Sequence, residues 1–280
     1  MRKNTPKTLL TIAGYDPSSG AGITADLAVF ASHGFFGVSA ITALTVQSTL
    51  GVQRVQAVNG SLLEQTLLCL EEDFVNSGIK IGMLATEENV VVVARFLEQR
   101  RARGLRAAVV LDPVLRSTSG SELLSARGLS AMRDLLLPLV DWVTPNRAEL
   151  GALTHSETAT EDAVERRAQN LMRIYPGLGI VVTGGDAGDA SLASDLLMDS
   201  AGECAWLRSE KFQSTATHGT GCAFSSALLC GLAKGLAPAG AVREAKAYVA
   251  GAIRNAPGLG GGRGPMSLDW ARAVIAEERD

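Results

Sequence analysis

Short apolar segments alternate with segments of helical character along most of the chain, and this alternation restricts the fold more than any other feature. Apolar segments that predict strands lie at 8–13, 36–46, 52–58, 79–84, 107–111, 140–144 and 179–183. Strands this apolar are typical of a parallel sheet that is covered on both sides. The alternation with helices therefore predicts an α/β fold with one central, mostly parallel sheet and helices on both of its faces.

The remaining segments complete one domain over residues 1–280. Residues 191–199 and 203–208, with a turn between them, predict a small antiparallel hairpin at the edge of the sheet. Helices are expected at about 23–32, 60–76, 86–103, 122–137, from 145, 160–175, 222–235 and 238–255, with a final helix after the glycine-rich loop 258–264. Since no stretch resembles a linker, we expect a single domain.

Composition excludes several classes of function. The chain carries a formal net charge of −3 and no basic run longer than Arg100-Arg101, so nucleic-acid binding is not expected. No apolar run approaches the ~20 residues of a membrane helix, and the run at 9–13 is too short for a signal sequence. Four cysteines without a CxxC pair and three histidines without zinc-ligand spacing are typical of a reduced, cytoplasmic protein.

The stretch Thr217-His218-Gly219-Thr220-Gly221-Cys222 stands directly before an apolar helical run and predicts an anion site. Gly219 and Gly221 allow φ > 0 and a close approach of the backbone to a ligand. The N–H groups of the first helical turn, together with the helix dipole, favour an anion there. The thiolate of Cys222 is favoured at such a helix start. The simpler interpretation is a glycine turn with a buried free cysteine.

Polar or functional side chains follow the ends of several expected strands, where ligands bind in open α/β sheets. The set consists of Asp16, Gln47, Met83, Asp112, Asn146, Glu149, Thr183 and Cys222. Asp112 and Glu149 can supply the one or two carboxylates that Mg²⁺ takes beside phosphate oxygens, and Asn146 faces the same side of its helix start as Glu149. The alternative is that Asn146 only caps the helix and Glu149 complements its dipole.

Two common nucleotide motifs do not account for the chain. The Walker sequence G-x-x-x-x-G-K-[ST] does not occur. Gly20-x-Gly22-x-x-Ala25 matches the dinucleotide fingerprint, but it does not follow its strand directly, and no acidic residue ends the next strand. A nucleotide would then be held by helix N-termini and glycines. The loop 14–22 is interpreted as a place where Asp16 and backbone groups face a small substrate, or as a long turn.

A series of motifs, collinear over nearly the whole chain, resembles the hydroxymethylpyrimidine and phosphomethylpyrimidine kinases of thiamine synthesis. The motifs are Gly14-x-Asp16-Pro17-Ser18-x-Gly20-Ala21-Gly22-Ile23-x-Ala25-Asp26-Leu27, Thr42-Ala43-Leu44-x-x-Gln47, Lys80-Ile81-Gly82-Met83-Leu84, Asp112-Pro113-Val114, Thr144-Pro145-Asn146-x-x-Glu149, His218-Gly219-Thr220-Gly221-Cys222-x-x-Ser225 and Ala241-Val242-x-x-Ala245-Lys246. This resemblance implies a ribokinase-like fold, ATP and Mg²⁺, and a homodimer.

The resemblance also assigns expected roles to individual residues. Gly14, Asp16, Asp26, Gln47, Met83 and Val114 are expected to bind the pyrimidine substrate. Asn146, Thr183, Gly185 and Lys246 are expected to bind the nucleotide, and Asp112 and Glu149 to hold the metal. Gly219, Thr220, Gly221 and Cys222 are expected to be catalytic.

The expected reaction is in-line transfer of the γ-phosphoryl group to the hydroxymethyl oxygen of 4-amino-5-hydroxymethyl-2-methylpyrimidine, and then to its monophosphate. The N–H groups from Gly219 to Cys222 would form the anion hole. Cys222 would either take the hydroxyl proton or complete the hole, and the second role is preferred because a thiolate beside a triphosphate is electrostatically unfavourable.

Some positions depart from the family pattern. Thr118 and Thr183 stand where lysine is frequent, and Asp186 stands where histidine is common. The loss of basic side chains bears most on the second, phosphate-accepting step. Pyridoxal kinase activity is therefore an alternative. A non-catalytic pyrimidine sensor on the same fold is a second one, although a sensor would not need the residues of a Mg²⁺-phosphate site.

Overall fold

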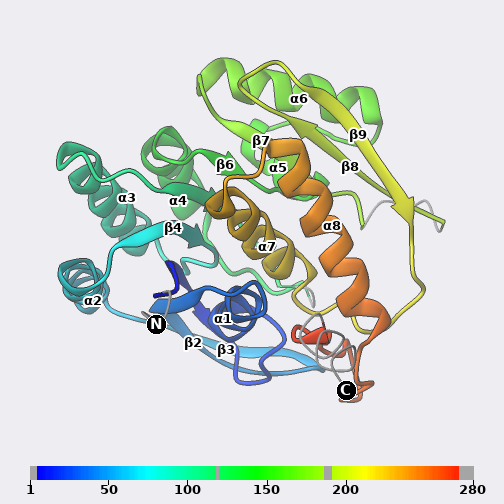
Figure 1. The fold of residues 1–280 in the computed structure, drawn as a ribbon, viewed down its shortest axis with the longest axis horizontal. Coiled ribbons are helices and arrows are strands. Elements are labelled where there is room, and N and C mark those ends of the chain that lie inside the picture. Colours follow the sequence, from blue (N-terminus) through cyan, green and yellow to red (C-terminus); the bar gives the residue numbers. More distant parts are fainter. Residues whose placement is uncertain (1–4, 118–119, 186–190, 271–280) are drawn as a thin grey trace.

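The structure of the protein, a computed structural model, describes residues 5–117, 120–185 and 191–270. Its described strands form one nine-stranded sheet in the order β3-β2-β1-β4-β5-β6-β7-β8-β9 (Figure 1). The strands are β1 (Thr8–Tyr15), β2 (Phe36–Ser48), β3 (Gly51–Ala57), β4 (Asn76–Ile81), β5 (Ala108–Leu111), β6 (Trp142–Val143), β7 (Gly179–Val182), β8 (Leu192–Met198) and β9 (Cys204–Glu210).

The sheet is parallel in its middle and antiparallel at both edges. The pairs from β2 through β1, β4, β5 and β6 to β7 are all parallel. β8 and β9 form the expected antiparallel hairpin, so the predicted mostly parallel sheet with a small antiparallel edge is confirmed. β3 adds a second antiparallel edge beside β2, because the two residues between these strands can join only antiparallel neighbours.

Helices cover both faces of the sheet, as the alternation of segments predicts (Figure 1). One face carries α1 (Gly22–Ser32), α7 (Thr220–Lys234) and α8 (Pro238–Arg254). The other carries α2 (Gly60–Asp73), α3 (Glu87–Ala102), α4 (Ala126–Ala131), α5 (Arg147–Thr154) and α6 (Glu161–Ile174).

Successive strand residues feed two separate cores. Leu9 packs with the α1, α7 and α8 side, whereas Leu10 packs with the other side. On β5, Val110 likewise packs with the α1, α7 and α8 side, and Val109 packs with the other side. Since side chains alternate across a strand, residues that read as continuously apolar are buried on both sides of the sheet.

Helix boundaries follow local capping chemistry. Thr86 caps α3 and accepts a hydrogen bond from the Asn89 N–H at 3.1 Å, and Glu87 and Glu88 lie in the first turn of this helix. The helix expected over 122–137 begins later, at Ala126, because Ser125 caps it. It then continues as a π turn (Met132–Leu136) and a 3₁₀ turn (Leu137–Leu139) that contains Pro138.

Two further expectations need adjustment. The strand expected over 79–84 ends at Ile81, so Met83 lies in the loop that follows. The final helix expected near the C-terminus lies beyond residue 270, outside the described residues. Among the described helices, none is both long and apolar enough to cross a membrane.

Candidate active site

The candidate site lies where the direction of the chain through the sheet reverses. β1 has β2 on one side and β4 on the other, although the chain reaches β2 first. At such a switch point the loops after neighbouring strands diverge and leave room for a ligand beyond the carboxyl ends of the strands. The loops after β1 and β4 carry Asp16 and Met83, two of the residues expected at the site.

The loop after β1 packs directly against the glycine motif that precedes α7. A Cβ atom added to Gly219 would lie 1.9 Å from the Gly20 carbonyl oxygen, and one added to Gly20 would lie 2.2 Å from the His218 ring. Gly219 also has a φ of +79° at the N-cap of α7, which favours glycine. The absence of side chains at both positions therefore allows two segments about 200 residues apart in sequence to meet.

Asp16 fixes this contact with its carboxylate. Oδ2 lies 2.7 Å from Nε2 of His218 and accepts the Ala21 N–H at 2.9 Å, and Oδ1 accepts the Ser18 N–H and hydroxyl. Burial alone would raise the pKa of Asp16, but the hydrogen bonds from His218 and Ser18 outweigh it and lower the pKa to about 2. Asp16 thus shapes the loop, and both of its carboxylate oxygens are engaged within the chain.

The N-terminus of α7 is open in the way that the sequence predicts. Gly219 has no side chain to cap the helix, and the first intrahelical bond runs from the Ala223 N–H to the Gly219 oxygen at 2.9 Å. The N–H groups of Thr220, Gly221 and Cys222 precede that bond. Gly221 is exposed, and a Cβ atom added to it would meet nothing closer than the Asp112 carboxylate at 3.8 Å. The backbone therefore offers an accessible set of donors beside Asp112.

The thiol of Cys222 differs from the expectation. Its helix-start position predicts a favoured thiolate, but burial, with smaller contributions from the charges of Asp112 and Asp26 and against the opposing charge of Lys80, raises the pKa of the thiol to about 12. Cys222 is therefore a neutral thiol in this structure. The expectation fails because burial and two nearby carboxylates disfavour the thiolate more than Lys80 favours it.

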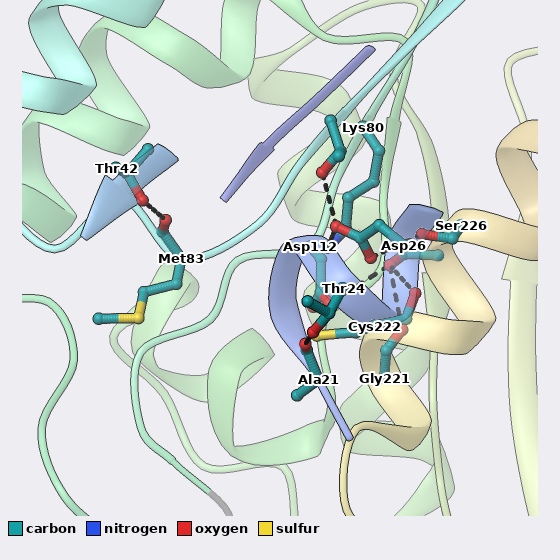
Figure 2. A network of polar contacts seen from close by, with 12 residues as sticks. Ala21, Thr24, Asp26, Thr42, Lys80, Met83, Asp112, Gly221, Cys222 and Ser226 are labelled. Carbon is teal, nitrogen blue, oxygen red and sulfur yellow. Dashed lines mark hydrogen bonds and ion pairs between the residues drawn. The ribbon is translucent and has the colours of Figure 1, made fainter. Parts of the chain in front are cut away.

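Asp112 lies immediately after β5 and is buried at 4% exposure. Oδ2 accepts a hydrogen bond from the Ser225 hydroxyl at 3.3 Å. Burial raises the pKa of Asp112 to about 6 against the opposing charge of Lys80. Figure 2 shows Asp112 beside Cys222 and Gly221, with the Asp26–Lys80 pair next to them.

Asp26, expected to contact substrate, has a different role. It is fully buried on α1, where its carboxylate accepts hydrogen bonds from Thr11, Lys80 and Ser226 at 2.6, 2.9 and 2.8 Å. This correction has a simple cause: the helical position that carries Asp26 faces the sheet, so the carboxylate joins α1 to β1, β4 and α7 and presents no atom to a ligand.

A small apolar wall stands apart from the two main cores. It contains Met83 with Ala43 and Leu123, and Val114 packs against it. Gly14 faces the same wall, since a Cβ atom added there would lie 2.9 Å from the Met83 sulfur. Three of the residues expected to contact the pyrimidine are therefore together. Gln47 lies further along β2, half-buried and on the same face as Ala43 by strand alternation.

The expected nucleotide and metal residues meet at the start of α5. Asn146 Oδ1 accepts the Glu149 N–H, and Glu149 Oε2 accepts the Asn146 N–H, both at 2.9 Å, which is a capping box. Thr183 is bridged to Asn146 after β7, and no described residue lies within 4 Å of a Cβ atom added to Gly185. The capping interpretation of Asn146 is thus confirmed, while the site interpretation stays a prediction.

Lys246, which the resemblance assigns to the nucleotide, is held by an ion pair within the chain. Its ammonium donates to Asp195 Oδ2 at 2.6 Å and to the Ala193 oxygen at 2.9 Å, which ties α8 to β8. Asp195 Oδ1 in turn accepts the Gly184 N–H at 2.8 Å. Lys246 therefore acts on the loop after β7 through Asp195, and its charge is paired within the chain.

The residues present are compatible with Mg²⁺. In the described part of the chain no three His, Cys, Asp or Glu groups gather to hold a metal. Mg²⁺ does not require such a cage, since it is usually held by one or two carboxylates together with water and substrate phosphates. Asp112 and Glu149 follow the neighbouring strands β5 and β6 and offer that kind of oxygen donor.

Sequence reasoning missed several residues that build this site. Lys80, His218, Ser226 and Asp195 were not among the expected site residues. Lys80 could have been noticed in the sequence, because it is a single charged residue between Ile79 and Ile81 in an apolar strand. The partners of the other three are between 51 and 202 residues away, and no local pattern reports such contacts.

The fold and the open helix N-terminus define a phosphotransferase of the ribokinase-like class. The family model described as phosphomethylpyrimidine kinase matches residues 16–267, and the chain belongs to this family. A Streptomyces coelicolor protein named hydroxymethylpyrimidine/phosphomethylpyrimidine kinase is 39% identical over 95% of this chain and 96% of its own.

Solved structures of relatives agree with this fold. The Bacillus subtilis pyridoxal kinase in an ADP complex has a TM-score of 0.86 at 30% identity and covers 96% of this chain and 99% of its own. The Staphylococcus aureus pyridoxal kinase in complex with pyridoxal has a TM-score of 0.84 at 30% identity and covers 97% of this chain and 96% of its own.

Proposed function

We propose that the protein transfers the γ-phosphoryl group of ATP to the hydroxymethyl oxygen of 4-amino-5-hydroxymethyl-2-methylpyrimidine, and then to the phosphate of the product, in thiamine biosynthesis. The observation that carries the proposal is the exposed N-terminus of α7 beside the buried carboxylate of Asp112. In the transfer, the bond from the γ-phosphorus to its bridging oxygen breaks and a bond to the acceptor oxygen forms.

The substrate would lie between the loop after β1 and the apolar wall. Met83 and Val114 offer apolar contact, Gly14 leaves room beside the Met83 sulfur, and the Gln47 amide can both donate to and accept from an aminopyrimidine edge. Charge that develops on the transferring group would be stabilised by the N–H groups of Thr220, Gly221 and Cys222. Asn146, Thr183 and Gly185 would line the nucleotide side.

Asp112 and Glu149 would hold Mg²⁺, which supplies charge neutralisation for the phosphate oxygens. Cys222 would complete the anion hole as a thiol, because burial raises its pKa and so disfavours the thiolate that a proton acceptor would need. A loose phosphoryl-transfer transition state makes positioning and charge stabilisation the main requirements, which is compatible with a thiol that is not a base.

The test is ADP formation from ATP and Mg²⁺ with hydroxymethylpyrimidine, its monophosphate and pyridoxal in parallel. We expect turnover with the pyrimidine and its monophosphate, and loss of both activities when Mg²⁺ is chelated. Turnover with pyridoxal alone would replace the proposal by the pyridoxal kinase alternative, which the pyridoxal complex of a relative favours. Pyrimidine binding without any ADP formation would indicate a sensor.

The homodimer and the cytoplasmic location stay predictions. The exposed apolar side chains Leu44, Val46 and Leu50, on β2 and the turn after it, support a subunit contact on that edge of the sheet, and sedimentation equilibrium would test it.

A further inference from the structure

Lys80 is a buried charge that the proposed mechanism does not use. It stands in β4 between two core isoleucines, and its side chain and that of Asp26 are both 0% exposed. Burying a charge is costly unless it is paired and hydrogen-bonded. Here the ammonium lies 2.9 Å from Asp26 Oδ2. Because Asp26 is also bonded to Ser226 of α7, this buried charge lies close to the helix of the candidate phosphate site.

The chain reserves space for this ammonium. A Cβ atom added to Gly82 would lie 2.7 Å from Nζ of Lys80 and 3.2 Å from the Ala13 Cβ atom. Gly82 therefore provides the room in which Nζ reaches Asp26. Because Lys80 lies in β4 and Gly82 directly follows that strand, the local sequence sets both the charge and the space.

The surroundings of Lys80 are anionic. Asp26 and Asp112 are buried carboxylates, and Lys80 acts electrostatically on both of them and on the Cys222 thiol. Asp26 is bonded to Ser226 at 2.8 Å, one turn beyond Cys222 on α7, and Asp112 is bonded to the adjacent Ser225. Both carboxylates thus lie directly beneath the first two turns of α7.

An incoming triphosphate would meet this charge pattern at short range. With Lys80 present, the three groups carry a formal charge of −1 when ionised. Without it, no positive side chain would offset the two carboxylates beneath the phosphate site, and Mg²⁺ held by Asp112 would leave the charge of Asp26 unbalanced. Repulsion between charges is much stronger in a buried site than in water, so removal of the ammonium would oppose phosphate binding even where the fold survives.

We propose that Lys80 is a charge-balancing residue of the phosphate site, which offsets Asp26 and Asp112 beneath the N-terminus of α7. The inference rests on the proposed kinase function. In a purely structural ion pair, loss of either partner would have the same effect. In a charge-balancing pair, loss of Lys80 should weaken phosphate binding, whereas loss of the Asp26 charge should not.

The test compares Lys80→Met with Asp26→Asn. Both variants break the pair, and both are expected to lower the melting temperature. The dissociation constant of AMP-PCP with Mg²⁺, measured by calorimetry, separates them. We expect Lys80→Met to weaken binding at least about tenfold, and Asp26→Asn to bind as tightly as the wild type or more tightly. The double variant, with the wild-type formal charge restored, should bind within about threefold of wild type.

Leu229→Val serves as the control, because Leu229 is a core residue of α7 that faces Gly78 and not the ion pair. It should lower the melting temperature without changing AMP-PCP affinity. Equal weakening by Lys80→Met and Asp26→Asn would overturn the inference. If Lys80→Met does not fold, weakened binding by Asp26→Asn would overturn it alone. Wild-type protein that binds no AMP-PCP would overturn the proposed function and this inference together.

Discussion

Single residues fasten the two halves of the candidate site to each other. Asp16 and His218 join the loop after β1 to the motif before α7 through a 2.7 Å contact between Oδ2 and Nε2. The hydrogen bonds from His218 and Ser18 overcome the effect of burial and lower the pKa of Asp16 from 3.8 to about 2. A carboxylate with a lowered pKa stabilises the fold above its unfolded-state pKa, and that stability is lost as the pH falls toward the folded-state pKa.

We therefore predict an acid-sensitive contribution from Asp16 between about pH 4 and pH 2. Asp16→Asn should be less stable than wild type near neutral pH, and the difference in the free energy of unfolding should shrink as the pH falls through this range. Urea denaturation of both proteins at a series of pH values measures this difference in the free energy of unfolding. A difference that stayed constant from pH 6 to pH 2 would contradict the assignment.

Residue chemistry was predictable from sequence only in part. The strand-end positions identify Asp112 and Met83, because a short apolar strand and the residues after it are visible locally, whereas Val114 was expected only from the family resemblance. The thiolate expected at Cys222 was wrong, since burial of the thiol and the nearby carboxylates of Asp112 and Asp26, which come from distant segments, raise its pKa. Asp26 was misassigned for the same reason: the motif shows its presence but not that its carboxylate points at Lys80, 54 residues away.

At the scale of elements, α7 decides how the site is presented. Its N-cap Gly219 combines a φ of +79° with a close approach to the Gly20 carbonyl. The same helix ends at Gly235, which has a φ of +90° but nothing within 4 Å of an added Cβ atom. The two glycines share the backbone requirement, and only the first also mediates a contact between segments.

This difference predicts unequal costs for the two alanine substitutions. Gly235→Ala should lower the free energy of unfolding by roughly 1 to 2 kcal/mol, the cost of a strained left-handed residue. Gly219→Ala should cost more, because the loop after β1 must also move away. Chemical denaturation of both variants gives the comparison. Equal losses would mean that the Gly20–Gly219 contact contributes nothing to stability.

Element boundaries show where sequence patterns lose information. Thr86 was predictable as an N-cap because capping is local, whereas the helix expected from 122 begins at Ala126, although its cap Ser125 is also a local signal. The ion pair between Lys246 and Asp195 was not predictable. From the sequence, a lysine on α8 could equally well bind a phosphate or pair with a residue of β8. The pairing is set by how α8 packs, which the sequence does not show.

At the scale of the whole molecule, the two-sided parallel sheet was the most predictable feature. Apolar strands and amphipathic helices alternate over nearly the full length, and short connections leave few alternatives. The antiparallel direction of β3 was not predicted, because the strands expected at 36–46 and 52–58 leave a longer link than the two residues between β2 and β3. The sequence does not show that distant loops meet at the switch point beside β1. Their meeting brings strand ends, a glycine motif and one helix N-terminus together into the site.

The most direct test of the central claim is the turnover of Gly221→Ala. An alanine Cβ atom there meets only the Asp112 carboxylate, at ordinary contact distance, so the fold should tolerate it, as it should tolerate the control Gly240→Ala in α8. The added methyl group would occupy the space before the α7 donors. We predict an unchanged melting temperature, unchanged pyrimidine affinity and a kcat lowered at least about tenfold. A kcat equal to that of wild type would contradict the assignment of this helix N-terminus as the phosphate site.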